Sequence, residues 1–285
     1  MEAALLLPLE KKIALSLEKI KEWYDYYDGK VYISFSGGKD STVLMHLVRS
    51  LYPDVPLVYF DTGLAFPEER TYALSFGQIE IVRVKKTFKE IITKYGYPLV
   101  SKETARKIYD IKTSKSAVLR EKRLFGDVNN NGRIAQKWLY LSREDILISD
   151  RCCYYMKTEP RFRYEKLSGR RPFVGNMAAD SRLLRDAFMK TGVNAFDTNT
   201  PASMPLGFWR DVDIWEYINK YNIEYCSIYD KGYTKTRCTF CMYGVHMEKG
   251  KNKFQLMKET HPEMYEMAMT ELGLDHCLTL MGVPH

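Results

Sequence analysis

Residues 34–42 read Ser-Phe-Ser-Gly-Gly-Lys-Asp-Ser-Thr and directly follow an apolar stretch, residues 31–33. The pattern predicts a short strand that enters a glycine turn, followed by an amphipathic helix over residues 42–51. Two adjacent glycines permit a tight turn and a close approach of the backbone to a ligand. The helix would direct free N–H groups and the positive end of its dipole into the turn. Because Lys39 and two serines add donors, we expect the turn to bind a polyphosphate.

The spacing of this loop differs from both common glycine-rich phosphate loops, Gly-x-x-x-x-Gly-Lys-Ser/Thr and Gly-x-Gly-x-x-Gly. Its six residues from Ser36 to Ser41 instead resemble the PP-loop of the ATP pyrophosphatase superfamily, whose members split ATP between the α- and β-phosphates. The alternative is a chance Gly-Gly turn capped by Asp40. The position of the match between a strand and a helix disfavours that alternative.

Further apolar runs predict the fold. We expect parallel strands at residues 56–62, 79–84 and 172–176. Helices are expected at Leu9–Tyr27, at 205–221 beyond the opening of that segment, and at 262–280 with a break at Leu272-Gly273. Strands that alternate with helices indicate an α/β fold, with a twisted parallel sheet and helices on both faces. Ligands of such sheets bind beyond the C-terminal ends of the strands, where residues 36–41, 61–63 and 175–176 would lie.

The net positive charge of the chain comes from one segment. Eleven Lys or Arg and four Asp or Glu residues lie between Lys102 and Arg143, a surplus equal to the whole net charge of +7. A turn-rich stretch, residues 126–133, interrupts this segment, and residues 101–150 are interpreted as a helical insertion over the sheet edge. The basic surface would bind nucleic acid or a nucleotide. A solvated helical face explains the same pattern equally well.

Length and composition suggest one large domain or a domain with an extension. We expect residues 1–225 to form the nucleotide-binding domain and residues 226–285 a C-terminal segment that completes a metal site. No apolar run approaches the ~20 residues of a membrane span. The apolar patch within residues 1–8 is preceded by no basic residue, so a signal peptide is not expected. Six cysteines are too few for a disulfide scaffold, and their clustering indicates a metal in the reducing cytoplasm.

Four of the cysteines form the candidate metal site. Cys152 and Cys153 are adjacent, and Cys238 and Cys241 stand in Cys-Thr-Phe-Cys. Four thiolates are enough for a [4Fe–4S] cluster or tetrahedral zinc. Zinc sites usually join two short-spaced pairs, and adjacent cysteines strain a tetrahedral site, which favours the cluster. The alternative is a buried pair of small residues and a separate redox pair.

The later segments resemble the phosphoadenylyl-sulfate (PAPS) reductase family within the PP-loop superfamily, over roughly residues 30–245. Residues 59–68, Tyr-Phe-Asp-Thr-Gly-Leu-Ala-Phe-Pro-Glu, are similar to the family's Asp-Thr-Gly-x-x-Phe-Pro-Glu segment, which borders the adenosine pocket. Residues 175–182 resemble its Gly-x-x-x-x-Glu-Ser segment, with Asp180 in place of Glu, and residues 205–218 resemble its Pro-Leu-x-x-Trp helix. The cysteine pattern is similar to that of assimilatory adenylyl-sulfate reductases.

The loop and the resemblance together imply an adenine nucleotide alpha-hydrolase-like fold and a nucleotide site. That site would comprise Ser34, Phe35, Ser36, Gly37, Gly38, Lys39, Asp40, Ser41, Asp61, Thr62, Gly63, Gly175, Asp180, Ser181 and Arg182. Lys39 and Asp40 are the expected catalytic residues. Lys39 would offset charge on departing pyrophosphate, and Asp40 with Asp61 would hold Mg²⁺. Family members often carry Arg three residues after the Ser, where this chain has Leu184, flanked by Arg182 and Arg185.

Two departures from the family bear on the reaction. Sulfonucleotide reductases usually have a degraded loop, whereas residues 36–41 keep it intact. Those reductases attack sulfur with the cysteine of a C-terminal Glu-Cys-Gly-Leu-His segment, and the nearest match here places Leu272 at that position. Leucine cannot form a thiosulfonate. Cys277 would substitute only if the tail folds differently, and otherwise it and Cys226 are expected to be inert thiols. Both departures favour ATP use.

The leading hypothesis is therefore an ATP-binding enzyme with a [4Fe–4S] cluster that adenylates a substrate for sulfur transfer. It would resemble phage-type members or the iron–sulfur component of DNA phosphorothioation, and the cluster would deliver sulfur or be structural. One alternative is a reductase of adenylyl sulfate or its 3′-phosphate that uses Cys277. Another is a non-catalytic subunit that binds nucleic acid through residues 102–143. A sulfur-donor protein and a second copy in a homodimer are further expected partners; a membrane is not.

Overall fold

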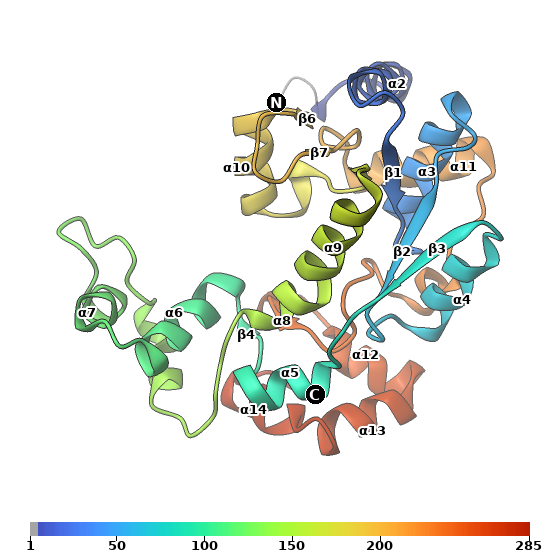
Figure 1. Cartoon of the computed structure of the whole chain (residues 1–285). Helices are drawn as coiled ribbons and strands as arrows, with labels where there is room; N and C mark the ends of the chain where they lie inside the picture. The colour runs from blue at the N-terminus through green and yellow to red at the C-terminus, as the bar shows by residue number, and fades with distance from the viewer. Residues whose placement is uncertain (1–4) are drawn as a thin grey trace. The chain divides into compact units, whose positions relative to one another are not determined.

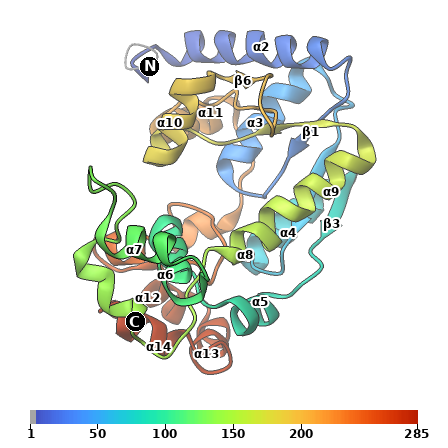
Figure 2. The same cartoon turned by 60° about the vertical axis from the view of Figure 1, so that its left-hand side comes forward.

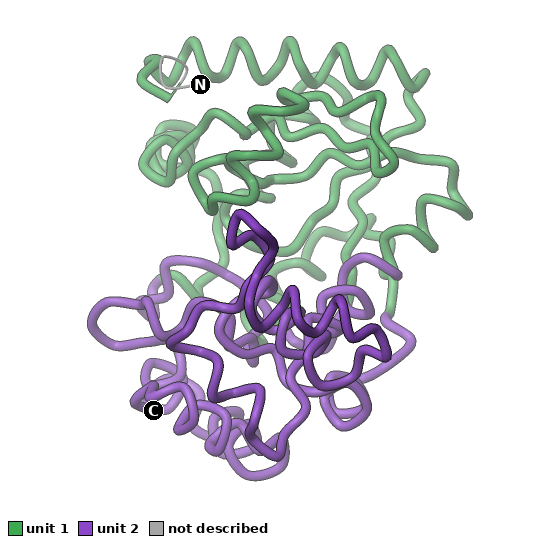
Figure 3. Tube along the Cα trace, turned by 90° about the vertical axis from the view of Figure 1, so that its left-hand side faces the viewer, with its two compact units in different colours: residues 1–61, 65–83, 160–229 green, residues 62–64, 84–159, 230–285 purple. Residues whose placement is uncertain are grey.

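The structure is a computed structural model that describes residues 5–285, and its chain divides into two compact units. Figure 3 shows unit 1, which comprises Met1–Asp61, Ala65–Arg83 and Pro160–Tyr229, and unit 2, which comprises Thr62–Leu64, Val84–Glu159 and Asp230–His285. Residues 101–150 thus group with the C-terminal segment. The expected domain boundary at residue 225 stays a prediction. The apolar patch within residues 1–8, for which no signal peptide is expected, lies partly outside the described residues.

Unit 1 is built on a six-stranded sheet with the order β3-β2-β1-β5-β7-β6 (Figure 1). The strands are β1 (Val31–Ser34), β2 (Leu57–Asp61), β3 (Ile79–Arg83), β5 (Arg171–Val174), β6 (Asn194–Ala195) and β7 (Ala202–Ser203). All neighbours pair in parallel except β6 and β7. The four strands expected from the sequence lie side by side, so the predicted α/β fold with a parallel sheet is confirmed.

Alternate side chains of the strands feed two separate cores, because successive residues of a strand point to opposite faces. Ile33 and Leu57 face the larger core, which helices α2 (Leu9–Tyr26), α3 (Lys39–Leu51) and α11 (Asp211–Tyr221) complete. Tyr32 and Val58 face the other side, where they pack with Tyr164 of α9 (Glu159–Ser168). Helices therefore cover both faces of the sheet. Unit 1 also contains α4 (Pro67–Ser75), η3 (Ala178–Asp180) and α10 (Arg182–Thr191), and η4 (Ser227–Lys231) begins in unit 1 and ends in unit 2.

Polar contacts fix α2 and α11 within unit 1. The Lys12 Nζ lies 2.5 Å from the Asp213 carboxylate, and both side chains are buried. The Ser16 hydroxyl donates to the Pro205 carbonyl oxygen at 2.8 Å and accepts from the Trp209 indole N–H at 2.9 Å. A buried ion pair is costly to break, so these contacts orient the start of α11.

Unit 2 is largely helical. Its elements are α5 (Phe88–Tyr95), α6 (Lys102–Thr113), α7 (Ala117–Phe125), η1 (Gln136–Ser142), α8 (Arg151–Cys153), η2 (Tyr154–Thr158), η5 (Val245–Met247), α12 (Lys253–Thr260), α13 (Pro262–Thr270) and α14 (Leu274–Leu280), with a parallel pair of β4 (Leu99–Val100) and β8 (Met242–Tyr243). The break expected at Leu272-Gly273 separates α13 from α14, and Gly273 has φ +64°. Within residues 5–285, no helix combines the length and apolarity that a membrane span requires.

Candidate functional site

The glycine turn between β1 and α3 has the conformation that its sequence requires. Gly37 has φ +80°, and a Cβ at this residue would lie 2.6 Å from the Glu69 carbonyl oxygen. Only glycine meets both conditions without strain. Gly38 is the N-cap of α3, which begins at Lys39, three residues before the start that periodicity indicates. The early start places the first N–H groups of α3 in the turn.

The loop holds itself together by hydrogen bonds among its own hydroxyls. The Ser36 amide and hydroxyl both lie within hydrogen-bonding distance of the Ser41 hydroxyl, at 3.2 and 3.1 Å. The Ser41 and Thr42 hydroxyls donate to the Gly38 carbonyl oxygen at 2.8 and 3.1 Å. These contacts shape the turn, so a ligand would meet a preformed loop.

Lys39 is the best-defined group of the loop. Its side chain is buried, and its Nζ lies 2.8 Å from Asp40 and 2.7 Å from Asp211. Its backbone N–H donates to the Tyr229 hydroxyl at 2.9 Å. Burial alone would lower the pKa of Lys39, but the charges and hydrogen bonds of Asp40 and Asp211 outweigh it, so the pKa is raised. Lys39 is therefore a fixed positive charge at the start of α3.

Carboxylates outnumber the ammonium at this end of α3. Burial raises the pKa of Asp40, Lys39 lowers it again, and the charges of Asp180 and Asp211 push it upward. Asp180 and Asp211 thus lie close enough to Asp40 to interact with it. Two of these carboxylates, those of Asp40 and Asp211, hold the Lys39 ammonium between them. Such a site suits a polyphosphate that arrives with a divalent cation.

The structure brings the segment after β5 against the loop. A Cβ on Gly175 would lie 3.1 Å from the Asp40 carbonyl carbon and from the Ser41 nitrogen, so glycine permits this approach. The Asp180 carboxylate accepts from the Met177 N–H at 3.1 Å. The Ser181 hydroxyl caps α10, accepting from the Leu184 N–H at 3.2 Å.

Other predicted site residues lie differently. Arg182 is 93% exposed and 3.7 Å from Asp186, and Arg185 is exposed too, so neither side chain is directed into the unit. Asp61 ends β2 and lies 3.4 Å from Arg70. Ser34 ends β1, and the side chain of Phe35, the next residue, is buried in the larger core.

Thr62 and Gly63 belong to unit 2. The Thr62 hydroxyl accepts from the Leu64 N–H at 3.1 Å, and Gly63 has φ +67°. The Leu64 carbonyl oxygen accepts from the Thr239 N–H at 2.8 Å and from its hydroxyl at 2.7 Å. The segment after Asp61 is therefore tied to the Cys-Thr-Phe-Cys turn.

The four cysteines of the predicted metal site all lie in unit 2. Cys152 and Cys153 sit on α8, immediately before the π-helical turn η2. The Cys-Thr-Phe-Cys turn is closed by a hydrogen bond from the Cys241 N–H to the Cys238 carbonyl oxygen at 3.0 Å. π-Helical turns frequently occur at functional sites. The six cysteines of the chain form no disulfide.

The cysteines share one electrostatic environment. A hydrogen bond from Cys152 lowers the pKa of Cys153 to about 6, with help from the charges of Lys157 and Lys102. That hydrogen bond, burial and the sulfurs of Cys241 and Cys238 raise the pKa of Cys152. All four sulfurs raise the pKa of Lys157, that of Cys238 most. The donor set therefore has the chemistry of a [4Fe–4S] or zinc site.

The sulfurs are nevertheless not drawn together into a finished metal site. Among the described residues, no group of three or more His, Cys, Asp or Glu side chains is arranged to hold a metal ion. The four residues fit the predicted cluster by type and neighbourhood, and the cluster stays a prediction.

The remaining cysteines are buried, as expected of inert thiols. Cys226 and Cys277 both have no exposed surface. Burial raises the pKa of Cys277 to about 12, which leaves almost no thiolate near neutral pH. Leu272, at the position of the family's nucleophile, is buried too. The expectation that the tail offers no reactive thiol thus agrees with its geometry.

Sequence reasoning missed three residues that shape these sites. Asp211 and Tyr229 contact Lys39 from positions far along the chain. Nothing in the local sequence marks them, although Asp211 opens the helix resembling the family's Pro-Leu-x-x-Trp segment. Lys157 follows Cys153 by four residues, a spacing that places both on one side of a helix, so this partner was readable.

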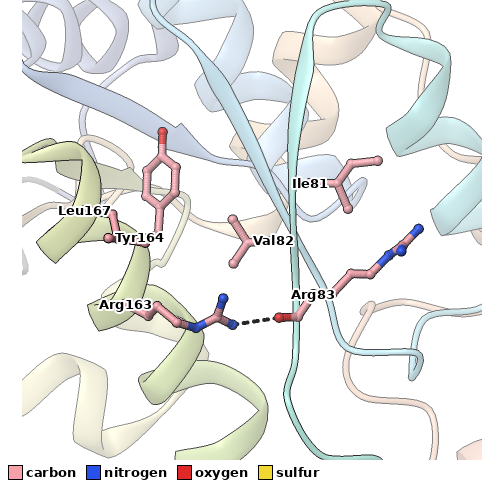
Figure 4. A pocket seen from close by; sticks show the side chains of 6 residues that line it. All are labelled: Ile81, Val82, Arg83, Arg163, Tyr164 and Leu167. Carbon is pink, nitrogen blue, oxygen red and sulfur yellow. Dashed lines mark hydrogen bonds between the residues drawn. The ribbon is translucent and has the colours of Figure 1, made fainter.

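A separate hollow of ≈460 Å³ lies between the edge strand β3 and α9 (Figure 4). Its lining includes Val82 and Tyr164, and the Arg163 guanidinium donates to the Arg83 carbonyl oxygen at 2.6 Å. None of the predicted site residues lines it. It is a feature of the sheet edge and not of the strand-end loop.

Comparison with known proteins gives a family and several relatives. The sequence profile of the phosphoadenosine phosphosulfate reductase domain matches residues 30–122 and 118–243. Two uncharacterized proteins of Methanocaldococcus jannaschii are each 26% identical, covering 96% and 87% of this chain but only 56% and 42% of their own lengths. The chain therefore spans about half the length of these two relatives.

Two further comparisons concern named reductases. The adenosine 5′-phosphosulfate reductase of Staphylococcus haemolyticus is 26% identical over 78% of this chain and 75% of its own length. A crystal structure of phosphoadenylyl-sulfate reductase from Candida auris, in a phosphate complex, is 17% identical and covers 81% of this chain and 96% of that one, with a TM-score of 0.46.

Proposed function

Because the chain belongs to the phosphoadenosine phosphosulfate reductase domain family, we propose that it is an enzyme of sulfur metabolism that binds Mg-ATP at residues 36–41. In this proposal it transfers AMP to an acceptor and releases pyrophosphate, which prepares the acceptor to receive sulfur. The substrate class and the reaction come from the intact loop, and the connection to sulfur comes from the family and from its named relatives.

The observation that carries the proposal is the Lys39 ammonium at the start of α3. It is buried, held by Asp40 and Asp211, and placed where the N–H groups of a 13-residue helix point. A positive charge at a helix N-terminus is suited to oxygens that gain charge as pyrophosphate leaves. The surrounding carboxylates favour a nucleotide that brings Mg²⁺, which Asp40 would share with phosphate oxygens.

The chemistry follows in two redox-neutral steps. An acceptor oxygen attacks the α-phosphorus, a new P–O bond forms, and the bond to the β-phosphate breaks with release of pyrophosphate. A hydrosulfide equivalent from a donor then attacks the activated carbon or phosphorus, and AMP leaves with the acceptor oxygen. In the first step Lys39 stabilises the leaving group, while the Gly37 turn permits the polyphosphate to approach the backbone.

The proposal includes a [4Fe–4S] cluster. Cys152, Cys153, Cys238 and Cys241 would hold it, and it would supply an anchoring point for sulfur or a structural brace. Lys157 and Lys102 would offset part of the negative charge of a cluster with four thiolates. These two lysines are the positively charged side chains that the protein would place near the cluster.

The test is an activity assay on protein purified without oxygen. Mg-ATP and candidate acceptors, including RNA and DNA, are added, and AMP and pyrophosphate are quantified. We expect AMP and pyrophosphate in equal amounts, only with an acceptor present, and none from Lys39→Ala. Formation of ADP and phosphate, or turnover unchanged in Lys39→Ala, would reject the proposed reaction.

A second candidate is reduction of adenylyl sulfate or its 3′-phosphate to sulfite. The relative named as an adenosine 5′-phosphosulfate reductase favours it. Reduction needs an accessible thiol that attacks the sulfur. Leu272 and the buried Cys277 do not supply one, so ATP-dependent adenylation ranks first.

A further inference from the structure

The surplus of basic over acidic residues in the chain lies on α6, α7 and the segment that follows them in unit 2. Eight of the eleven basic side chains in this segment are exposed, namely Lys102, Arg106, Lys115, Arg120, Lys122, Arg133, Lys137 and Arg143. Ion pairs engage Lys107, Lys122 and Arg123. Three of the four acidic residues of this segment form ion pairs with these three basic residues. Most of the remaining basic side chains are exposed to solvent.

Helix α7 itself lies outside the core of unit 2. It packs beside α6 (Figure 2), and none of its residues is buried. Val118 is 77% and Phe125 69% exposed. A helix that presents apolar and basic side chains together, with little contribution to a core, is built as a contact surface.

A cavity of ≈320 Å³ lies at the end of the same basic segment. Lys137 and Trp138 form one wall, residues 245–252 form another, and residues 281–284 close it. Ligand cavities span roughly 300–1,000 Å³. This one is at the small end of that range, so it suits a single planar group and not an extended ligand.

The lining of the cavity has the parts needed to hold an aromatic ring. The Trp138 and His246 rings meet edge to face, with centroids 5.0 Å apart, and the Lys137 Nζ lies 5.4 Å from the Trp138 ring. The His246 Nδ1 is buried and has no hydrogen-bond partner among residues 5–285. Glu248 also lines the cavity; its Oε2 accepts from the Lys253 N–H at 2.8 Å, and its other carboxylate oxygen would accept a hydrogen bond from a ligand. The fold therefore leaves the hydrogen-bonding capacity of the His246 ring nitrogen unused.

We propose that this face of unit 2 binds single-stranded nucleic acid, with phosphates along α6 and α7 and one unpaired base in the Trp138–His246 cavity. A planar heterocycle with polar edges fits the cavity, and a chain of phosphates fits the exposed basic side chains. The strand is single because a base must be unpaired to enter a cavity and stack on an aromatic wall. The site uses no residue of the nucleotide loop, so it stands apart from the proposed adenylation.

The test is fluorescence anisotropy with labelled single-stranded RNA, single-stranded DNA and duplex DNA on the full chain, at several salt concentrations. Lys115→Gln/Arg120→Gln/Lys137→Gln removes three exposed charges, and Lys11→Gln/Lys30→Gln/Lys166→Gln is the matched control in unit 1. Trp138→Ala removes the stacking wall, and Trp138→Phe keeps an aromatic ring. Thermal melts confirm that every variant is folded.

We expect single strands to bind more tightly than duplex, and the RNA and DNA arms identify the natural strand. The basic triple variant should lower the slope of log affinity against log salt by about 2, at ~0.7 per phosphate contact. Trp138→Ala should weaken binding roughly 5- to 100-fold, with Trp138→Phe close to wild type. The matched control and Lys39→Ala should bind normally.

Several results would overturn the inference. They are no binding by the folded wild type, equal losses in both triple variants, and unchanged affinity in Trp138→Ala. Dextran sulfate bound as tightly as the oligonucleotides, with no effect of Trp138→Ala, would show an unspecific polyanion surface and no base site.

Discussion

The glycine loop of unit 1 and the cysteine region of unit 2 each set a lysine among anionic groups, and they differ in how complete they are. Lys39 is buried between the carboxylates of Asp40 and Asp211, which already hold its ammonium group. Lys157 lies beside four cysteine sulfurs, and two of these thiols, Cys152 and Cys238, have raised pKa values and keep their protons at neutral pH. The charged groups of the loop are therefore already paired with one another in the folded chain. In the proposed function, the cysteine region would become a charged site when a metal displaces those protons.

The largest effect expected from this difference concerns iron. Protein purified without oxygen should be brown and carry about four irons per chain. Cys238→Ser should lose this iron almost completely, whereas Cys226→Ser, at a buried cysteine outside the site, should keep it. Iron and sulfide analysis measures both. Stoichiometric zinc without iron or sulfide, after expression with iron supplied, would contradict the cluster.

The position of Asp211 beside Lys39 depends on the packing of α11, which the ion pair between Lys12 and Asp213 holds to α2. Lys12→Met leaves the Asp213 carboxylate buried with only Arg210 as partner, and should lower the free energy of unfolding by about 3 kcal/mol. Lys12→Met/Asp213→Leu should regain much of it, because no charge then remains buried. Urea denaturation at neutral pH measures these values. A Lys12→Met variant as stable as wild type would show that the pair contributes nothing.

The same pair gives the stability a defined pH dependence. Partial burial would raise the pKa of Asp213, but hydrogen bonds from Arg210 and Lys12 lower it below its ordinary 3.8. A lowered carboxyl pKa stabilises the fold above the ordinary value, and this contribution disappears as the pH falls through the folded-state value. We expect wild type to lose stability below about pH 4 more steeply than Lys12→Met/Asp213→Leu in acid titrations followed by circular dichroism. Parallel curves would contradict this assignment.

A smaller effect should distinguish free ATP from Mg-ATP. Asp211→Asn removes one of the carboxylates around Lys39, so the site depends less on a divalent cation. The ratio of the dissociation constants of free ATP and Mg-ATP should fall by about fivefold, because Asp211 is half exposed and its charge is partly screened. Titration calorimetry with and without EDTA gives the ratio. Asp186→Asn, a carboxylate on exposed α10, is the control and should leave the ratio unchanged.

The smallest expected effect is none at all. With thioredoxin supplied, wild type should release no sulfite from adenylyl sulfate or its 3′-phosphate, and Cys277→Ser should not differ. The reason is that Cys277 is buried and its pKa is raised to about 12. Sulfite release that disappears in Cys277→Ser would make the chain a reductase with a relocated nucleophile.

Much of the fold was readable because long apolar runs carry a period. The strand before Ser34, the N-terminal helix and the break at Gly273 all appear as the sequence predicts. The two-residue strands β6 and β7 carry no such signal, because two residues establish no alternation. The grouping of residues 84–159 with the C-terminal segment depends on contacts between distant parts of the chain, which periodicity does not report.

The residues of the candidate sites could likewise be predicted from the sequence only where a local pattern marks them. Gly37 and Lys39 are marked by a local motif, and Lys157 by its helical spacing from Cys153. Asp211 and Tyr229 were not readable, because they reach Lys39 only through the packing of α11 and η4 against α3. The exposure of Arg182 was not readable either, since the motif fixes its position in the chain and not the direction of its side chain.

The central claim, that the loop binds a polyphosphate through Lys39, is tested most directly by calorimetric titration of Mg-ATP into oxygen-free protein. Wild type should bind Mg-ATP more tightly than adenylyl sulfate. Lys39→Ala should lose about 2–4 kcal/mol of that binding, and Lys30→Ala, an exposed lysine of the same unit, should lose none. Equal Mg-ATP affinity in wild type, Lys39→Ala and Asp40→Ala, or tighter binding of adenylyl sulfate, would contradict the account.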